Sequence, residues 1–208
     1  MKRLPIFTLL IVLLAVNAFA ASFLAVLPTS ETKTSGVNQT VESTLTLSNT
    51  GTSNALNAVF PASINFTGAK TNFTAVINYN NSSPLIVPPA NSSQIKYNFT
   101  VPADAFSEAY SGIFNFTAGG ENYAEYKLTL NVAASPKLSV SNLTGSMGTG
   151  TSRIFNLVLE NKGNTDVTAT IAKAELVSAA NSSNKVPAEN ITLAQNSVVI
   201  PYRQSKTV

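Results

Sequence analysis

The segment Leu45-Thr-Leu-Ser-Asn-Thr-Gly51 has a counterpart in Leu157-Val-Leu-Glu-Asn-Lys-Gly163, 112 positions further along the chain. Each segment places leucines two residues apart, continues with Asn-x-Gly and then enters a new alternation of apolar and polar residues. A period of two is typical of a strand with one buried face, and Asn and Gly tolerate a positive φ in a tight turn. The repetition predicts one unit, a strand, a tight turn and a returning strand, that occurs twice.

A second pair of similar segments has nearly the same spacing. Val87-Pro-Pro-Ala-Asn-Ser-Ser-Gln-Ile95 resembles Ile200-Pro-Tyr-Arg-Gln-Ser-Lys-Thr-Val208, with Pro88 and Pro201 separated by 113 positions. The first copy continues for about forty residues after this segment, and the second copy has no counterpart to them in the sequence. We therefore expect the second unit to lack a closing hairpin, that is, two strands.

Short runs of β-branched and aromatic residues alternate with clusters of Gly, Pro, Asn and Ser from residue 21 to residue 132. Six or seven strands at this spacing predict an antiparallel β-sandwich of immunoglobulin-like type. The candidate strands are 41–48, 55–60, 75–79, 94–101, 112–117 and 123–132. Residues 110–130 have the pattern of a closing hairpin, and residues 102–110 suggest a helical turn.

The chain is expected to be all-β, with two immunoglobulin-like sandwiches in tandem. The predicted parts are a signal peptide over 1–20, a first sandwich over 21–134 and a second sandwich over 135–208. The second sandwich is expected to be truncated or completed by another strand. Its candidate strands are 137–140, 153–160, 167–177 and 197–208, with residues 172–180 compatible with either a strand or a helical turn.

The first twenty residues have the pattern of a secretory signal peptide. Lys2 and Arg3 form a basic start, residues 6–16 an apolar stretch, and Ala18-Phe-Ala20 a cleavage site of the A-x-A type. The apolar stretch is too short for a membrane anchor and is followed by small residues. We expect a protein secreted to the cell exterior, with no membrane insertion by the residues that remain after cleavage.

Charged residues make up 11% of the chain, against roughly 25% in ordinary soluble proteins. Removal of Lys2 and Arg3 with the signal lowers the formal net charge from +3 to +1, so no basic field is left to attract nucleic acid. With no His and few carboxylates, the stability is expected to change little in acid. The chain has no Cys, so disulfides cannot stabilise it.

The sequence offers no convincing catalytic, metal or cofactor site. There is no His for acid–base or metal chemistry and no Cys for nucleophilic attack or zinc. Asp104 and Glu108 are four residues apart, but no third oxygen-rich partner lies nearby in the sequence, which favours a solvated turn. Gly148-Thr-Gly150 lacks the Lys and the helix of a phosphate-binding loop. We therefore expect a protein that is not an enzyme and holds no cofactor.

The chain is dense in Asn-x-Ser/Thr sequons, the acceptors of N-linked glycans. Four of them are Asn-Phe-Thr, and on a strand the period of two sends Phe inward while Asn and Thr share the outer face. We expect heavy N-glycosylation, with Asn80 and Asn81 too close together for both to be occupied. The candidate sites are Asn38, Asn65, Asn72, Asn80, Asn81, Asn91, Asn98, Asn115, Asn142, Asn181 and Asn190.

Four features together resemble those of the structural surface glycoproteins of archaea, in the style of the Sulfolobales. They are the signal peptide, the tandem sandwiches with Asn-x-Gly, the dense sequons and the absence of a set of catalytic residues. The chain is similar to the small S-layer subunit, a glycosylated stalk of successive β-sandwiches followed by a coiled coil and a C-terminal membrane helix. The resemblance implies a structural role in supporting the outer lattice, with other surface-layer proteins or copies of itself as partners. It also implies that the natural chain continues beyond Val208 and supplies the missing strands.

The chain also resembles the thread-type pilin, a secreted sandwich protein whose N-terminal strand completes the sheet of a neighbour. An open second unit fits this resemblance, because an uncovered edge invites an added strand. One donor supplies one strand, whereas two strands are expected to be missing from the second unit. The N-terminal residues that could act as the donor also suit the first strand of their own domain. The candidate donor strand consists of Ser22, Phe23, Leu24, Ala25, Val26 and Leu27.

Overall fold

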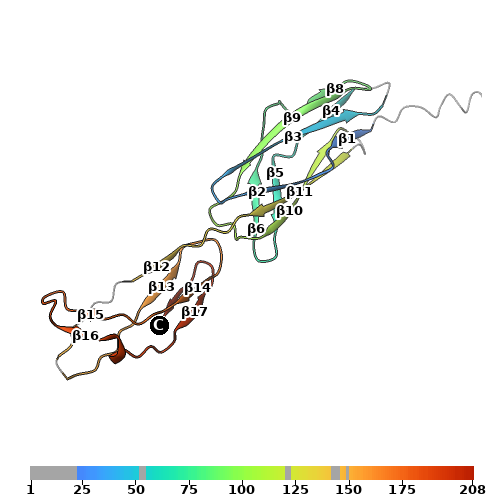
Figure 1. Cartoon of the computed structure of the whole chain (residues 1–208). Coiled ribbons are helices and arrows are strands. Elements are labelled where there is room, and N and C mark those ends of the chain that lie inside the picture. Colours follow the sequence, from blue (N-terminus) through green and yellow to red (C-terminus); the bar gives the residue numbers. More distant parts are fainter. Residues whose placement is uncertain (1–22, 52–54, 120–122, 142–145, 149) are drawn as a thin grey trace, which may run out of the picture. The chain divides into compact units, whose positions relative to one another are not determined.

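The computed structural model describes residues 23–51, 55–119, 123–141, 146–148 and 150–208. These residues form an almost entirely β structure whose one helical element is the short 3₁₀ turn η1 (Ala188–Asn190), so the all-β prediction is confirmed. They group into two compact units, labelled by their strands in Figure 1. Unit 1 contains the described residues up to Pro102 together with Ala109–Asn131, and unit 2 contains Ala103–Glu108 and Val132–Val208. The predicted signal peptide lies outside the described residues.

Unit 1 consists of two facing sheets and a two-stranded ribbon. The first sheet has the order β1 (Leu24–Leu27), β3 (Thr40–Asn49), β9 (Ser92–Thr100), β7 (Asn78–Tyr79). The second has the order β2 (Ser30–Ser35), β11 (Tyr123–Val132), β10 (Ala109–Thr117), β5 (Ser63–Thr67), β6 (Asn72–Val76). The ribbon pairs β4 (Leu56–Ala58) with β8 (Leu85–Val87).

Aromatic side chains from both sheets fill the core of unit 1. The ring of Phe66 on β5 lies 5.2 Å from that of Phe99 on β9, and Tyr97 on β9 lies 4.9 Å from Phe114 on β10. Such tilted pairs stabilise a core beyond the area they bury. The contacts hold the two sheets face to face, as in a sandwich.

Most predicted strands of the first sandwich are found, but the strand expected over 75–79 is divided between β6 and β7, which belong to different sheets. Three other strands escaped the sequence analysis. The closing hairpin is confirmed as β10 and β11, which pair from Ala109 opposite Asn131 to Thr117 opposite Tyr123. The missed strands are β2, β5 and β8, of which β2 carries only polar residues and so lacks the apolar alternation used to recognise strands. The helical turn expected over 102–110 is wrong, because Ala103–Glu108 forms no helix and β10 begins at Ala109.

Unit 2 is built from short strands. Its three-stranded sheet has the order β12 (Leu138–Val140), β13 (Val158–Asn161), β18 (Ser205–Thr207). Two ribbons accompany it, β14 (Val167–Thr170) with β17 (Ser197–Ile200) and β15 (Leu176–Val177) with β16 (Lys185–Val186). Residues 172–180 contain β15 and no helix. The unit begins at Val132, three residues before the predicted boundary, and includes Ala103–Glu108, a loop that the sequence did not assign to it.

The two sequence repeats correspond to the same arrangement of strands. The set β1-β3-β9 with the ribbon β4-β8 in unit 1 matches β12-β13-β18 with the ribbon β14-β17 in unit 2. The register agrees as well, because Leu24 lies opposite Asn49 and Leu138 lies opposite Asn161. Unit 2 therefore repeats these five strands of unit 1, and β18 occupies the place of the start of β9.

The Asn-x-Gly segment is not the hairpin turn predicted from the sequence. Asn49 ends β3 and Asn161 ends β13, and the chain then passes to a strand of another sheet rather than returning alongside. Gly163 allows a close approach of two backbone segments, because a Cβ there would lie 2.5 Å from Ser135 O and 2.6 Å from Lys137 N. Gly163 does not have a positive φ, which corrects the predicted turn geometry at this position.

Candidate functional site

The sequons of the Asn-Phe-Thr type lie on strands as the alternation predicts. Phe66, Phe99 and Phe116 are buried, while the asparagines before them, Asn65, Asn98 and Asn115, are exposed or half-buried. The alternation puts a phenylalanine into the core and an amide with its neighbouring hydroxyl on the outer surface of the same strand. In the fourth such sequon Asn72 is exposed and Phe73 is half-buried, because β6 is the edge strand.

Most candidate glycan acceptors are open to solvent. Asn81 is half-buried, and its Oδ1 is shielded from solvent without a hydrogen-bond partner. The Oδ1 of its neighbour Asn80 accepts a hydrogen bond from Lys96 N (2.7 Å). Asn142 lies outside the described residues. The exposed acceptors are Asn38, Asn65, Asn72, Asn80, Asn91, Asn115, Asn181 and Asn190.

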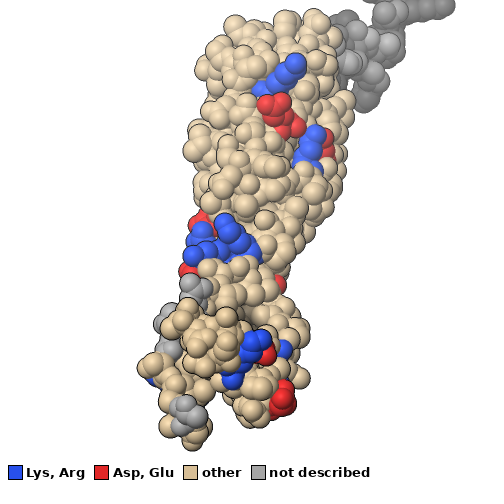
Figure 2. Space-filling view, turned by 60° about the vertical axis from the view of Figure 1, so that its left-hand side comes forward, with Lys and Arg blue, Asp and Glu red and all other residues tan. Residues whose placement is uncertain are grey.

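Few charges interrupt the surface. On the face shown in Figure 2, Lys, Arg, Asp and Glu form small separated groups among uncharged side chains. In the described part of the chain no group of three or more His, Cys, Asp or Glu residues is placed to hold a metal ion. Asp104 is exposed and Glu108 half-buried, both in the loop before β10. Within the described ranges no helix has the length and apolar character needed to cross a membrane.

Glu31 on β2 ties the two sheets of unit 1 together. Its Oε2 accepts hydrogen bonds from Ser43 Oγ on β3 (2.5 Å) and from the Tyr126 hydroxyl on β11 (2.8 Å), and its Oε1 lies 2.7 Å from Lys33 Nζ. Burial opposes the ionisation of Glu31, but the hydrogen bonds from Lys33, Ser43 and Tyr126 outweigh it and hold its pKa below the ordinary value. Burial raises the pKa of Tyr97, which lies beside Tyr126, to about 12. Because both of its oxygens are engaged by these three partners, the Glu31 carboxylate acts as a structural link.

The inner face of the unit 2 sheet is much less covered than the equivalent face of unit 1. Leu24 and Val26 on β1 are 6% and 4% exposed, whereas Leu138 and Val140 at the same register positions of β12 are 38% and 53% exposed. The buried core cluster of unit 2 has only four members, Leu159, Ala169, Val198 and Ile200. In unit 1 the equivalent face lies against the sheet that contains β10 and β11. We call the two exposed apolar positions of β12, Leu138 and Val140, the open face.

The candidate donor strand is paired within its own chain. Leu24, Ala25, Val26 and Leu27 form β1, which runs antiparallel to β3 from Leu24 opposite Asn49 to Leu27 opposite Thr46. The carbonyl oxygen of Phe23 accepts a hydrogen bond from Thr50 N (3.0 Å). Ser22 lies outside the described residues. β1 is an edge strand, so donation to a neighbour remains a prediction that requires these bonds to open.

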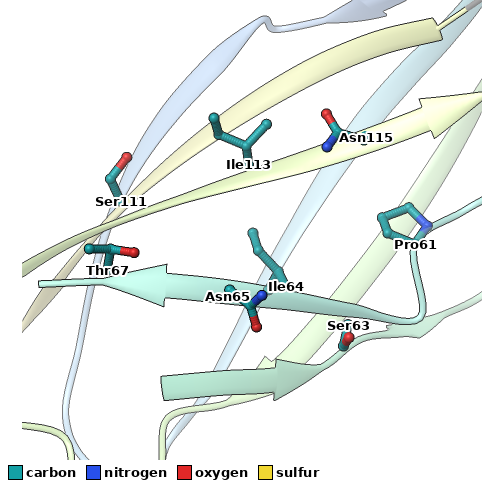
Figure 3. A pocket seen from close by; sticks show the side chains of 8 residues that line it. All are labelled: Pro61, Ser63, Ile64, Asn65, Thr67, Ser111, Ile113 and Asn115. Atoms are coloured by element: carbon teal, nitrogen blue, oxygen red, sulfur yellow. The ribbon is translucent and has the colours of Figure 1, made fainter. Parts of the chain in front are cut away.

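A hollow on the outer surface of unit 1 was missed by the sequence analysis. It lies between β5 and β10, has a volume of about 470 Å³ and is drawn in Figure 3. No local sequence pattern indicates this hollow, because it depends on how far two strands remain paired. It is lined by Pro61, Ser63, Ile64, Asn65, Thr67, Ser111, Ile113 and Asn115.

No protein-family model matches the chain, and no curated protein sequence matches it. Among solved structures, a family 123 glycoside hydrolase from Clostridium perfringens aligns with 50% of this chain and 22% of its own, at 13% identity and a TM-score of 0.44. The class 5 fimbriae chaperone CfaA aligns over 88% of this chain and 81% of its own, at 13% identity and a TM-score of 0.35. The secreted serine protease VesC from Vibrio cholerae aligns over 85% and 44%, at 11% identity and a TM-score of 0.33. Similarities at this level assign no function.

Proposed function

We propose that the chain is a non-enzymatic structural glycoprotein of the cell surface, the stalk part of an archaeal S-layer that supports the outer lattice above the membrane. The observation that carries the proposal is the open face of unit 2. A sandwich domain that leaves apolar residues of its central sheet in water gains stability when further strands cover them. In a stalk, such strands come from a continuation of the same chain, and in a filament they come from a neighbouring chain.

The surface of unit 1 supports the same proposal. Its outward strand positions carry amides and hydroxyls, including the sequons at Asn65, Asn98 and Asn115, and few charges. A neutral surface of this kind depends little on pH and accepts N-linked glycans along the length of its strands. Both properties suit a structural protein that stands outside the cell.

A matched pair of substitutions tests whether the open face is covered in the assembly. Val140→Asp places a charge at a position that is 53% exposed, so the isolated protein is expected to fold with its Tm nearly unchanged. The same variant is expected to be lost from the cell envelope, because an unpaired charge would then be buried under the added strands. Val26→Asp at the equivalent buried position is the control, and it is expected to destabilise unit 1 itself.

The measurements are the Tm of the purified variants and their amount in isolated envelopes, with electron microscopy of both preparations. The expected result is that the wild type is found in lattice-associated stalks and that Val140→Asp is absent from them. Val140→Asp present in the envelope at wild-type level would overturn the proposal that the open face is covered.

The alternative is a subunit of an extracellular pilus-like filament assembled head to tail by donor-strand complementation through residues 22–27. The observation that favours it is the position of β1 at the edge of its sheet, where a strand can exchange between chains. In the stalk, β1 stays in its own domain. The two assignments therefore differ in whether β1 must leave β3.

A reversible lock on β1 separates the two functions. Val26 and Leu47 are register partners in β1 and β3, and the chain has no Cys of its own, so Val26→Cys with Leu47→Cys allows a single disulfide. The filament requires that oxidation abolish assembly and that reduction restore it. The stalk requires that oxidation have no effect on incorporation. The single variant Val26→Cys, treated identically, controls for the loss of the buried valine.

A further inference from the structure

The hollow on unit 1 arises because β5 and β10 pair at one position only. Ser111 lies opposite Thr67, and the next pairing along β10 is an isolated bridge between Thr117 and Val59. Between these two positions the β10 side has residues 112–116 and the opposite side has residues 60–66, which is a bulge of two extra residues. Pro61, which has no N–H group, lies within the bulge. The strands separate there, as Figure 3 shows.

Backbone polar groups point into this gap from both sides. Ile77 N donates to Ala62 O, so alternation directs the N–H and C=O groups of Ser63 and Asn65 away from β6 and toward β10. Thr117 and Val59 exchange hydrogen bonds (2.7 and 3.2 Å), so alternation directs the backbone groups of Ile113 and Asn115 toward β5. Backbone groups at such a site need water or a ligand as partner.

The lining is neutral and of mixed polarity. It offers the hydroxyls of Ser63, Thr67 and Ser111 beside the side chain of Ile113, which is 49% exposed, and it contains no charged residue. A phosphate or a cation finds no opposite charge here. A sugar offers hydroxyl groups along its edge and C–H groups on its face, which matches a lining of hydroxyls, amides and the apolar side chains of Pro61, Ile64 and Ile113.

Two of the lining residues are themselves sequon asparagines, Asn65 and Asn115. The amide of Asn65 is drawn toward β6, because its Oδ1 accepts a hydrogen bond from Thr74 Oγ1 (2.7 Å). Asn115 lies on β10, in the stretch between the two paired positions, where the gap is open. We propose that the hollow holds the first sugars of an N-linked glycan attached to Asn115, which cover Ile113 and bond to the backbone groups of the gap. The inference rests on the glycosylation in the proposed function.

The test compares amide hydrogen exchange in glycosylated protein, in the same protein after glycan release, and in three variants. Asn115→Gln is expected to speed exchange several-fold in Ala109–Thr117 and Ser63–Thr67, as glycan release does, because the covering sugar is lost. Asn72→Gln, on the same sheet but outside the hollow, is the matched control and is expected to leave both segments unchanged. Asn65→Gln changes the other sequon asparagine of the lining and is expected to have a smaller effect than Asn115→Gln. Mass spectrometry reports the occupancy of each sequon.

The outcomes distinguish a failure of this inference from a failure of the proposed function. Occupied Asn115 with unchanged exchange after glycan release overturns the inference, and so does an unoccupied Asn115 in a protein glycosylated elsewhere; both leave the proposed function intact. A protein without any glycan overturns the inference together with the glycoprotein part of the proposed function. Equal effects of Asn65→Gln and Asn115→Gln would overturn the assignment to Asn115.

Discussion

Asn49 and Asn161 each stabilise, through one side chain, the segment in which the chain passes from one sheet to another. Asn49 Nδ2 donates to Val87 O (3.1 Å) and its Oδ1 accepts from Gly51 N (3.0 Å). Asn161 repeats both bonds, with Nδ2 donating to Ile200 O (3.0 Å) and Oδ1 accepting from Gly163 N (3.0 Å). Both amides are buried, so their bonds are sheltered from water. The sequence repeat therefore preserves a hydrogen-bond clamp rather than a turn.

Replacing Asn49 by Ala is expected to lower the free energy of unfolding of unit 1 by about 2–4 kcal/mol, because a buried C=O and an N–H group lose their partner. Asn161→Ala is expected to have the same effect on unit 2 alone. Urea unfolding measures both effects, and Asn57→Ala, an exposed position on β4, is the control. Equal stability of Asn49→Ala and Asn57→Ala would show that water replaces the clamp.

Glu31 gives unit 1 a specific sensitivity to acid. Because its pKa in the folded protein lies below the ordinary value of 4.5, its contribution to stability is complete above that value and is lost as the pH falls through the folded pKa. Glu31→Gln is expected to destabilise unit 1 by about 1–3 kcal/mol at pH 7, since the hydroxyls of Ser43 and Tyr126 lose a charged acceptor.

The difference between wild type and Glu31→Gln should shrink below pH 4.5, where the wild-type carboxyl also becomes neutral. Denaturant unfolding at pH 7 and in steps toward pH 2 measures it, with the exposed Glu42→Gln as control. A difference that stays constant across this range would rule out the proposed link. The expectation of little acid sensitivity, drawn from the absence of His, thus has one exception in Glu31.

At the scale of elements, Gly112 allows β10 to lie close to β5. A Cβ at this position would lie 2.6 Å from Ile64 Cδ1 and 2.9 Å from Phe66 Cε1, and both side chains are buried. Gly112→Ala is therefore expected to destabilise unit 1 by about 1–3 kcal/mol through overpacking. Adding Ile64→Val removes the atom nearest to the new methyl group, so the double variant should recover part of the loss.

Thermal unfolding of the two single variants and the double variant gives the coupling energy between positions 64 and 112. Strictly additive losses would show that strand separation, rather than contact with Ile64, causes the destabilisation. Gly163→Ala is a useful comparison, because there the new Cβ meets the backbone of Ser135 and Lys137, which no side-chain truncation can relieve.

The sequence predicted most strands that have one apolar face, although β5 was missed despite its alternation of Ile64 and Phe66 with polar residues. It failed where pairing alone defines the strand. β3, β9, β10 and β11 have clear alternation and were expected within a few residues of their observed bounds. β2 carries Ser30-Glu-Thr-Lys-Thr-Ser35, and its pairing is a tertiary property that no local pattern encodes. The hollow escaped for the same reason, since it depends on where β5 and β10 stop pairing. The outward position of the asparagines in the four Asn-Phe-Thr sequons, in contrast, follows from the period of two.

At the scale of the whole molecule, the two repeats differ in how much core they enclose. Unit 1 contains seven aromatic side chains that are less than 2% exposed: Tyr97, Tyr110, Tyr126, Phe66, Phe99, Phe114 and Phe116. Unit 2 has a buried cluster of four aliphatic residues with Leu157, Ile171 and Val208 partly buried against it. The same strand arrangement thus supports a closed sandwich in one unit and a partly covered one in the other.

The two units are therefore expected to unfold in separate steps, with unit 2 at the lower temperature, because apolar burial is the main favourable contribution to stability. Leu47 and Leu159 occupy equivalent positions opposite Val26 and Val140, and both are buried. Leu159→Ala should lower the Tm of the first calorimetric transition only, and Leu47→Ala the Tm of the second only. Each substitution should reduce the free energy of unfolding of its own unit by about 2–5 kcal/mol. A single transition shifted equally by both variants would contradict independent units. The same measurement can be made on protein taken from the assembled envelope. A lower transition that moves toward the upper one there would show that added strands cover the open face and supply the stability that unit 2 lacks alone.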